Sequence, residues 1–190
     1  LQAPRREIEK MLPFYNGKSP HAIASKRLEK QKLLGIVPPT AKLGMAGKFN
    51  PEGYGKTSAK RKDYIAECMA AYAAQIAIMD RGIGRILASL ERHRLSDNTI
   101  VMFLSDNGAT AEIPQNNKNK KTTLPTGPLG EVGCRDGYGP MWAAVSNTPY
   151  RQYKIETFDG GLSAPFIIRY PSKTVSYTHL RAHETGRNLV

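Results

Sequence analysis

The chain has 190 residues, of which 40% are hydrophobic and 23% are charged. This length suits one ordinary domain or a piece of a larger one, and the composition excludes a disordered protein. Twenty-eight basic residues against 16 acidic ones give a net charge of +12, which favours anionic partners such as sulfated or phosphorylated substrates, nucleic acid or an acidic surface.

The cysteines and the apolar runs exclude further classes. Cys68 and Cys134 are too few for a disulfide framework or a metal cluster. Cys68 lies in a helical pattern and is expected to be a small core residue, whereas Cys134 lies in a Gly-rich loop. No apolar run is long enough to cross a bilayer, and the first residues lack a signal-peptide pattern. Because the chain starts at Leu1 and not at Met, we expect it to be already cut, so this absence says nothing about compartment.

The first third of the chain is basic and interrupted by prolines. One helix is expected there, from about Pro20 to Leu34, and the rest of residues 1 to 62 is expected to connect elements over a core.

A long amphipathic helix is predicted from Asp63 to Arg94. Its apolar residues recur every three or four positions: Ile65, Met69, Tyr72, Ile76, Met79, Ile83, Ile86 and Leu90. Ser58 is a plausible N-cap. Gly82 and Gly84 each cost about 1 kcal/mol of helix propensity relative to Ala. We expect close backbone packing at both, and the alternative is that an exposed helix surface tolerates them.

A strand is predicted next, in the segment TIVMFLSDN from Thr99 to Asn107. Its six-residue apolar run indicates a buried strand, whose carboxyl end carries Asp106 and Asn107 to the edge where open α/β sheets bind ligands. Two oxygen donors favour Ca²⁺ or Mg²⁺ over zinc. The alternative is a tight turn, because Asp-Asn-Gly with Gly108 also suits one.

The region from 109 to 150 is rich in Gly, Pro, Asn and Lys, and no regular element is expected in it. Its NNKNKK segment (116 to 121) has no interleaved aromatic residues, which indicates a solvated loop and argues against nucleic acid. Trp142 and Tyr138 either line a substrate cleft or pack within the loop. A second strand is predicted at APFIIRY, from Ala164 to Tyr170. Helix, strand, loop and strand together indicate a layered α/β fold.

The end of the chain breaks this pattern. The string VSYTHLRAHET, from Val175 to Thr185, resembles the translation of a transposon-type sequencing adapter. We therefore expect residues 174 to 190 to be a non-native tail and residues 1 to 173 to be the domain. His179 and His183 carry no weight as metal ligands in this interpretation.

Three segments resemble the sulfatase family. Residues 64 to 110 are similar to the helix and strand before the second half of its metal site. Residues 137 to 171, with GYGPMW and KIETFDGG, resemble the later segment of arylsulfatases, and LEKQKLLGIVP (28 to 38) is also similar. The resemblance implies an alkaline-phosphatase-like layered α/β fold, here a partial domain from its central to late part, and hydrolysis of sulfate esters at a bound divalent cation, usually Ca²⁺, with Mg²⁺ as the other option.

The resemblance also assigns roles to three residues. Asp106 and Asn107 match the later pair of metal ligands, and Lys154 matches the sulfate-binding lysine, a substrate-binding and catalytic residue. Sulfate-ester cleavage develops negative charge on the sulfuryl and leaving-group oxygens, which a cation and an ammonium stabilise. The alternative for Lys154 is a solvated basic face beside Arg151. Residues 159 to 161 are expected to form a turn, and His21 and His93 are expected to be surface histidines.

The family's nucleophile, a formylglycine made in a Cys/Ser-x-Pro-x-Arg context, has no matching segment here. Cys68 precedes Met69 and Ala70, and Cys134 precedes Arg135 and Asp136. The early acidic metal ligands and the substrate histidine are also missing. We therefore expect an incomplete sulfatase, truncated at both ends and inactive alone.

Two other functions stay open. One is a phosphoesterase of the same superfamily, and the other is a non-catalytic binder of anionic polysaccharide or nucleic acid. On the sulfatase interpretation, the partner is a sulfate-ester small molecule or a sulfated glycan and not a nucleic acid. The frequent export of the family is compatible with a periplasmic or secreted location. The sequence leaves the ester and the oligomeric state open.

Overall fold

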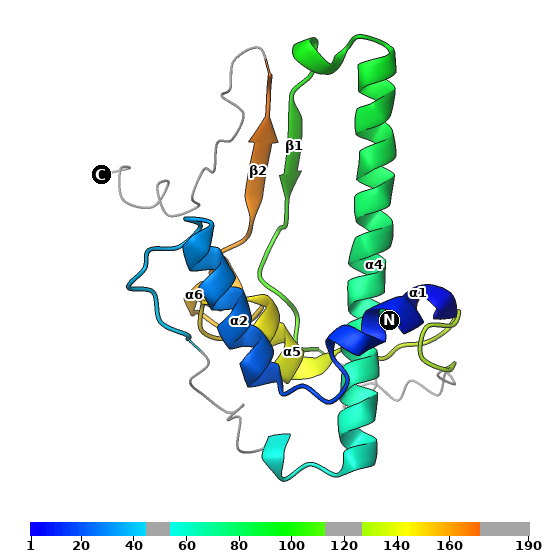
Figure 1. Ribbon diagram of the computed structural model, residues 1–190, viewed down its shortest axis with the longest axis vertical. Coiled ribbons are helices and arrows are strands. Elements are labelled where there is room, and N and C mark those ends of the chain that lie inside the picture. Colours follow the sequence, from blue (N-terminus) through cyan, green and yellow to red (C-terminus); the bar gives the residue numbers. More distant parts are fainter. Residues whose placement is uncertain (45–53, 113–126, 172–190) are drawn as a thin grey trace.

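A computed structural model describes residues 1–44, 54–112 and 127–171. In chain order they form α1 (Arg5–Met11), η1 (Leu12–Phe14), α2 (Pro20–Leu33), α4 (Ala59–Arg92), η2 (Ser96–Asn98), β1 (Val101–Leu104), α5 (Gly139–Ser146), α6 (Asp159–Leu162) and β2 (Phe166–Arg169). This part is mostly helical with one small sheet (Figure 1). The NNKNKK segment and the adapter-like tail with its two histidines lie outside the described residues.

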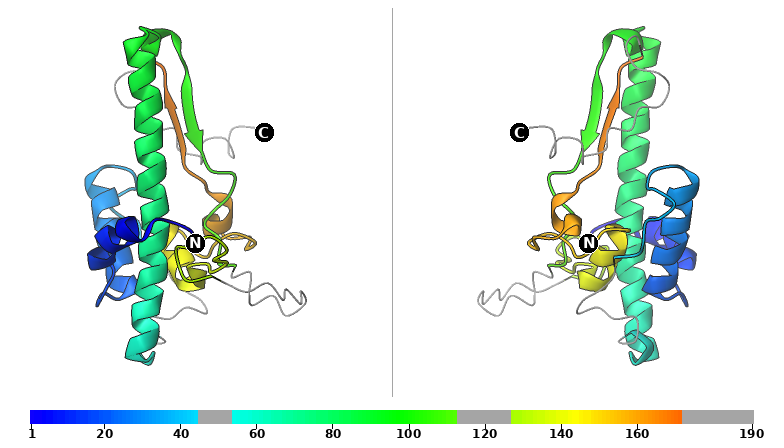
Figure 2. Two further views of the ribbon diagram at one scale, coloured as in Figure 1. Left: turned by 90° about the vertical axis from the view of Figure 1, so that its right-hand side faces the viewer. Right: turned by 90° about the vertical axis from the view of Figure 1, so that its left-hand side faces the viewer.

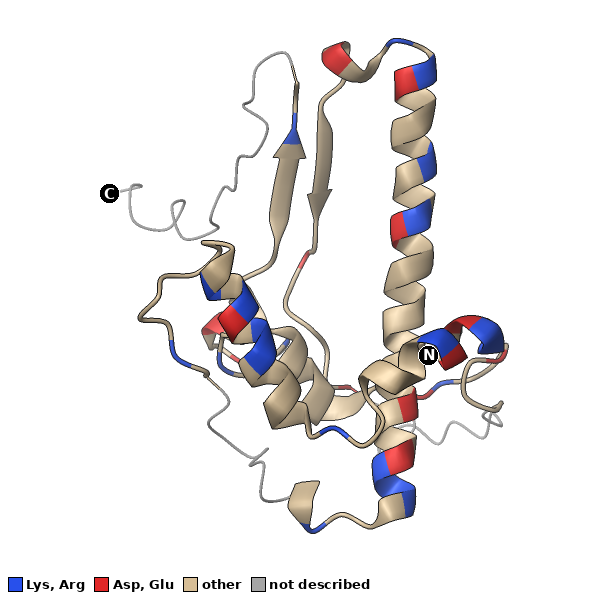
Figure 3. Ribbon diagram, viewed as in Figure 1, with Lys and Arg blue, Asp and Glu red and all other residues tan. Residues whose placement is uncertain are grey.

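The long helix α4 runs the length of the described structure (Figure 1). The predicted helix is confirmed and begins a few residues earlier, after Ser58, whose hydroxyl accepts a hydrogen bond from the Arg61 amide at 3.4 Å. Its buried residues all lie between Ala66 and Ala74. Charged side chains lie toward the two ends of the helix (Figure 3), and none occurs from Cys68 to Met79. The uncharged middle therefore faces the core.

One hydrophobic cluster joins α1 to α4. Ile8 is fully buried against the small residues Ala70, Ala71 and Ala74, with Ala3 beside it. The expectation that these N-terminal residues only connect other elements is wrong, because residues 5–14 form α1 and η1. A seven-residue helix is too short to show an apolar period in the sequence, and its packing on α4 stabilises it.

A second cluster joins α5 to α4 and α2. Trp142 is fully buried with Met69, Ala24 and Val145. Its indole Nε1 donates a hydrogen bond to the Ile65 carbonyl at 2.8 Å. The interpretation of residues 109 to 150 as free of regular elements is thus wrong at α5, whose eight residues lie between Gly- and Pro-rich segments. Trp142 is therefore a core residue within the described structure, which favours packing over the cleft-lining alternative.

The two predicted strands are confirmed, each four residues long, and they pair antiparallel with Val101 opposite Arg169 and Leu104 opposite Phe166. The expectation of a buried strand is wrong, since Met102 and Leu104 are 58% and 59% exposed. Burial alternates along both strands because successive side chains point to opposite faces of a sheet, and one face is open in the described structure. Figure 2 shows the two strands side by side next to α4.

Close packing at the two glycines of α4 is not found. A Cβ atom on Gly82 or Gly84 would meet no atom within 4 Å in the described structure. The close-approach interpretation is therefore wrong there, and both positions tolerate a side chain. No helix among the described residues combines the length and apolarity needed to cross a bilayer.

Candidate functional site

The candidate site lies where the chain leaves β1 and where it enters β2. Because the strands are antiparallel, the residues after Leu104 and those before Phe166 emerge at the same end of the sheet. The Ser105 amide donates to the Pro165 carbonyl at 3.3 Å, and the Gly108 amide donates to the Gly161 carbonyl at 3.2 Å. The two segments thus stay paired beyond the ladder.

The segment that carries Lys154 joins the same arrangement through its backbone. The Lys154 amide donates to the carbonyl of Ala109 at 2.9 Å. Ala109 follows Asn107 by two residues, so the lysine lies against the segment with the predicted metal pair although it is distant in sequence. The side chain of Lys154 is half-buried, whereas the neighbouring Arg151 is exposed and its guanidinium lies 4.2 Å from the centre of the Phe158 ring.

Glycines permit this close approach. A Cβ atom on Gly108 would overlap the carbonyl oxygen of Gly160, and one on Gly161 would overlap that of Glu156. The predicted turn at residues 159 to 161 is a single helical turn, α6. Backbone therefore packs directly on backbone at the site, with no side chain between.

The backbone around Lys154 is strained. Gln152 and Ile155 have φ angles of 66° and 83°, in the left-handed region that non-glycine residues rarely adopt. Each such residue costs on the order of 1–3 kcal/mol, and this strain persists only where the surrounding structure holds it. Lys154 therefore sits in a turn that needs external support.

Asn147, which no sequence pattern predicts as a site residue, supplies contacts to both segments. Its Oδ1 accepts a hydrogen bond from the Ala109 amide at 3.0 Å. Its Nδ2 donates to the carbonyls of Gln152 at 3.0 Å and Gly160 at 2.7 Å. In the sequence Asn147 is only a polar residue in an Asn-rich region, and its partners lie at separations that no local pattern reveals.

The chain around Asn147 is held in turn by α2. Arg27 donates to the Val145 carbonyl at 2.7 Å, and Gln31 donates to the Thr148 carbonyl at 2.8 Å. Burial lowers the pKa of the Arg27 guanidinium, which stays charged because an arginine pKa is far above neutral. A cation at the last carbonyls of α5 also suits the helix dipole. The helical layer thus fixes the loop that carries Asn147.

The predicted metal pair has the oxygen chemistry that a hard cation needs. Asp106 is exposed, and Asn107 is partly buried with its Nδ2 donating to the Gly108 carbonyl at 2.8 Å. That bond uses the amide nitrogen and not Oδ1. Ca²⁺ takes six to eight oxygen ligands, and no cluster of three or more His, Cys, Asp or Glu residues occurs within residues 1–44, 54–112 and 127–171. The pair therefore fits part of a coordination shell.

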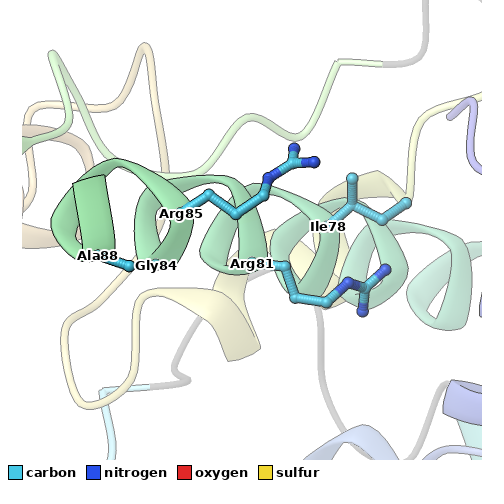
Figure 4. Close-up of a pocket in the computed structure, with 5 residues that line it drawn as sticks. All are labelled: Ile78, Arg81, Gly84, Arg85 and Ala88. Carbon is cyan, nitrogen blue, oxygen red and sulfur yellow. The ribbon is translucent and has the colours of Figure 1, made fainter. Parts of the chain in front are cut away.

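A pocket of about 560 Å³ lies elsewhere, on the C-terminal half of α4 (Figure 4). It is lined by Ile78, Arg81, Gly84, Arg85 and Ala88. Arg81 is already paired with the Glu7 carboxylate at 2.9 Å. Because all of its lining among the described residues comes from one helix, this is a shallow surface feature, and that lining includes none of the predicted site residues.

Comparison with known proteins identifies the class. The sulfatase family matches residues 22–187. The chain is 31% identical over 178 residues to an uncharacterized sulfatase of Schizosaccharomyces pombe, covering 90% of this chain and 32% of that protein. It is 32% identical over 182 residues to the arylsulfatase of Klebsiella aerogenes, covering 92% of this chain and 38% of that protein. A steryl-sulfatase of Rattus norvegicus is 33% identical over 105 residues, 55% of this chain and 14% of that protein.

This chain belongs to the sulfatase family, whose members are hydrolases with an alkaline-phosphatase-like fold. It spans about a third of the length of the first two relatives. The family match continues past residue 173 into the segment predicted to be a non-native tail. The described part, mostly helical with a two-stranded sheet, contains the helix, the strands and the loop on which the resemblance was based.

Proposed function

We propose that this chain contributes the divalent-cation ligands Asp106 and Asn107 and the sulfate-binding lysine Lys154 to the active site of a sulfuric ester hydrolase. The observation that carries this proposal is the hydrogen bond from the Lys154 amide to the Ala109 carbonyl at 2.9 Å. It brings the lysine's segment against the segment of the metal pair. The substrate class is a sulfate ester, either a small aryl sulfate or a sulfated glycan.

The chemistry requires these residue types. A bound Ca²⁺ or Mg²⁺ would stabilise negative charge on the sulfate oxygens. Asp106 supplies a negative charge to hold that cation, and Asn107 supplies a neutral carbonyl oxygen that leaves part of the cation's charge uncompensated. Lys154 holds the sulfate as a point charge with three donors, and its ammonium offsets the charge that develops as the ester bond breaks. In this proposal the nucleophile comes from another segment of the protein.

The sequence contains a matched control for the metal pair. The triplet Ser-Asp-Asn occurs twice, at residues 96–98 before β1 and at residues 105–107 after it. The first triplet forms η2 at the opposite end of the strand, and its Asp97 and Asn98 are exposed. Asp97→Ala and Asn98→Ala therefore remove the same groups from a place where the proposal expects no function.

The experiment uses the full-length protein that carries this sequence. Asp106→Ala is expected to weaken Ca²⁺ binding, measured by titration calorimetry, by about tenfold or more, because the site loses a charged ligand. Lys154→Ala is expected to lower kcat/KM for an aryl sulfate by about 10²–10³, the usual loss when a preorganised donor is removed. Asp97→Ala and the exposed-lysine variant Lys26→Ala should leave both quantities unchanged.

Two results would reject the assignment. Unchanged Ca²⁺ affinity and turnover in Asp106→Ala would exclude the metal role, and unchanged kcat/KM in Lys154→Ala would exclude the lysine. Turnover of the phosphate monoester with the same aryl leaving group is measured in parallel. A preference for phosphate over sulfate would favour a phosphoesterase of the same superfamily.

A further inference from the structure

We propose that Asn147 is a positioning residue, which fixes the turn of Lys154 against the strand end that carries Asp106 and Asn107. The inference rests on the proposed function, because it takes these three residues as the active groups. It adds a residue that touches neither cation nor sulfate and acts through the backbone.

The contacts of Asn147 join all three parts of the site. Its Oδ1 accepts from the amide of Ala109, on the segment that follows the metal pair. One Nδ2 hydrogen bond reaches Gln152, two residues before Lys154, and the other reaches Gly160 in α6. The carboxamide thus links the metal segment, the lysine turn and the entry to β2.

A carboxamide is the side chain that this position requires. The two Nδ2 bonds need two donors on one atom, and the Ala109 amide needs an acceptor on the other. In Asn147→Asp, a carboxylate would keep the acceptor but face the Gln152 and Gly160 carbonyls with oxygen. In Asn147→Ala, three partly buried backbone groups would lose their partner. Neither substitution preserves the arrangement.

Strain in the lysine turn explains why this support matters. Gln152, whose carbonyl Asn147 holds, is one of the two left-handed non-glycine residues that flank Lys154. Without that hydrogen bond, the turn gains freedom to relax toward ordinary backbone angles. The Lys154 side chain would move with it, and a shift of about 1 Å at a reacting group costs on the order of 100-fold in rate.

The alternative is that Asn147 only ends α5. Its backbone amide donates to the Ala143 carbonyl at 3.1 Å, and its own carbonyl accepts from the Tyr150 amide at 2.8 Å. These bonds belong to the main chain and survive any side-chain substitution except proline. The side-chain role and the helix-ending role can therefore be separated by mutation.

The test is a double-mutant cycle between Asn147→Ala and Lys154→Ala in the full-length protein. We expect Asn147→Ala to lower kcat/KM for an aryl sulfate by about 10–100-fold, as substitution of residues that orient ligands usually does. In the Lys154→Ala background the same substitution should cost less than about threefold, because the group it positions is gone. Titration with inorganic sulfate should give the same pattern for the binding affinity. Asn147→Ala should weaken sulfate binding when Lys154 is present and should have little effect in the Lys154→Ala background.

A further readout does not depend on activity. The Ala109 amide donates to Asn147 Oδ1, and the Lys154 amide donates to the Ala109 carbonyl. Asn147→Ala should therefore speed hydrogen exchange at both amides, while the α4 amides keep their protection. Gln75→Leu is the structural control, because Gln75 also donates from a side-chain amide to a backbone carbonyl, that of Gln2 at 3.0 Å, and neither residue belongs to the candidate site. It should change neither the sulfate affinity nor exchange at these two amides.

The outcomes separate the two proposals. Equal losses from Asn147→Ala in both backgrounds, or no loss, would overturn the role of Asn147 while leaving that of Lys154 intact. An unaffected Lys154→Ala enzyme would overturn the proposed function and this inference with it. If Asn147→Ala does not fold, the nearly isosteric Asn147→Asp carries the same expectation, and additive losses there would also overturn the inference.

Discussion

Gly108 and Gly160 pack backbone on backbone, so closely that a Cβ atom on Gly108 would overlap the carbonyl oxygen of Gly160. The same oxygen accepts the Asn147 Nδ2 hydrogen bond at 2.7 Å, which holds it in place. The strand end and the entry to β2 are therefore in contact without any side chain between them. Glycine at position 108 is a condition for the candidate site to form.

Gly108→Ala is expected to destabilise the protein by about 1–3 kcal/mol, the usual cost of overpacking. The oxygen that its methyl group meets is main-chain and cannot turn away as a flexible side chain would. Urea unfolding followed by the fluorescence of the single tryptophan, Trp142, measures this loss. An unchanged unfolding midpoint would contradict the close contact.

Gly84→Ala is expected to have the opposite effect. Gly84 lies within α4 and is exposed, and a Cβ atom at this position would have no neighbour within 4 Å in the described structure. Alanine should then stabilise the helix by up to about 1 kcal/mol through its higher propensity. The same urea titration checks it, with Gly108→Ala as the contrasting variant. A loss of stability would mean that another part of the protein packs against this turn.

Much of the fold could be predicted because the apolar pattern of α4 is long and the apolar runs of the two strands have clear ends. The α4 stripe continues for many turns, and the apolar runs that form β1 and β2 are followed closely by Asp106 and by Pro171. The short helices α1 and α5 could not be predicted, since seven or eight residues show too little of a 3.6-residue period. Packing of Ile8 and Trp142 on α4 stabilises them, and that packing is not local in sequence.

The candidate site likewise has residues whose place could be predicted from the sequence and residues whose place could not. A position at the end of a strand could be predicted for Asp106 and Asn107 from the apolar run before them. The approach of Lys154 depends on the antiparallel pairing of β1 with β2, which the spacing of the residues does not specify. Asn147 could not be found from the sequence because each of its three side-chain bonds crosses to another segment.

Stability should fall in acid through Glu7. Hydrogen bonds from Lys10 at 3.0 Å and Arg81 at 2.9 Å lower the pKa of this buried carboxyl, although its burial acts in the opposite direction. A carboxyl whose folded pKa lies below the unfolded one stabilises the fold above the unfolded pKa. That contribution disappears as the pH falls through the folded pKa.

The matched variants are Glu7→Gln and Glu9→Gln, both on α1, since Glu9 is exposed. The free energy of unfolding of Glu7→Gln should lie below that of the unsubstituted protein at pH 7, and the gap should narrow below about pH 4, where carboxyls protonate. Glu9→Gln should show little difference at either pH, because its pair with Arg5 lies at the surface. A gap for Glu7→Gln that is constant with pH would contradict the ionic role of Glu7.

The two free cysteines should differ in the free energy of the structural opening that exposes each thiol to solvent. Both are buried, but Cys68 lies in the middle of α4 against the core, and Cys134 lies in an irregular loop. Burial raises the pKa of the Cys68 thiol to about 11, so at pH 8 almost none of it is the reactive thiolate. A loop opens at a lower free energy than the middle of a packed helix.

Iodoacetamide at pH 8 should therefore modify Cys134 first, and Cys68 only under conditions that unfold the protein, as followed by mass spectrometry of the two peptides. Between pH 9 and 11 the unfolded thiol ionises before the folded one, so the protein should also lose stability as the pH rises through this range. Cys68→Ala lacks that ionisation and should have a flatter profile there. Modification of Cys68 as fast as Cys134 in the folded protein would show that the middle of α4 is open to solvent, and the core built on Ala70 and Trp142 would then be wrong.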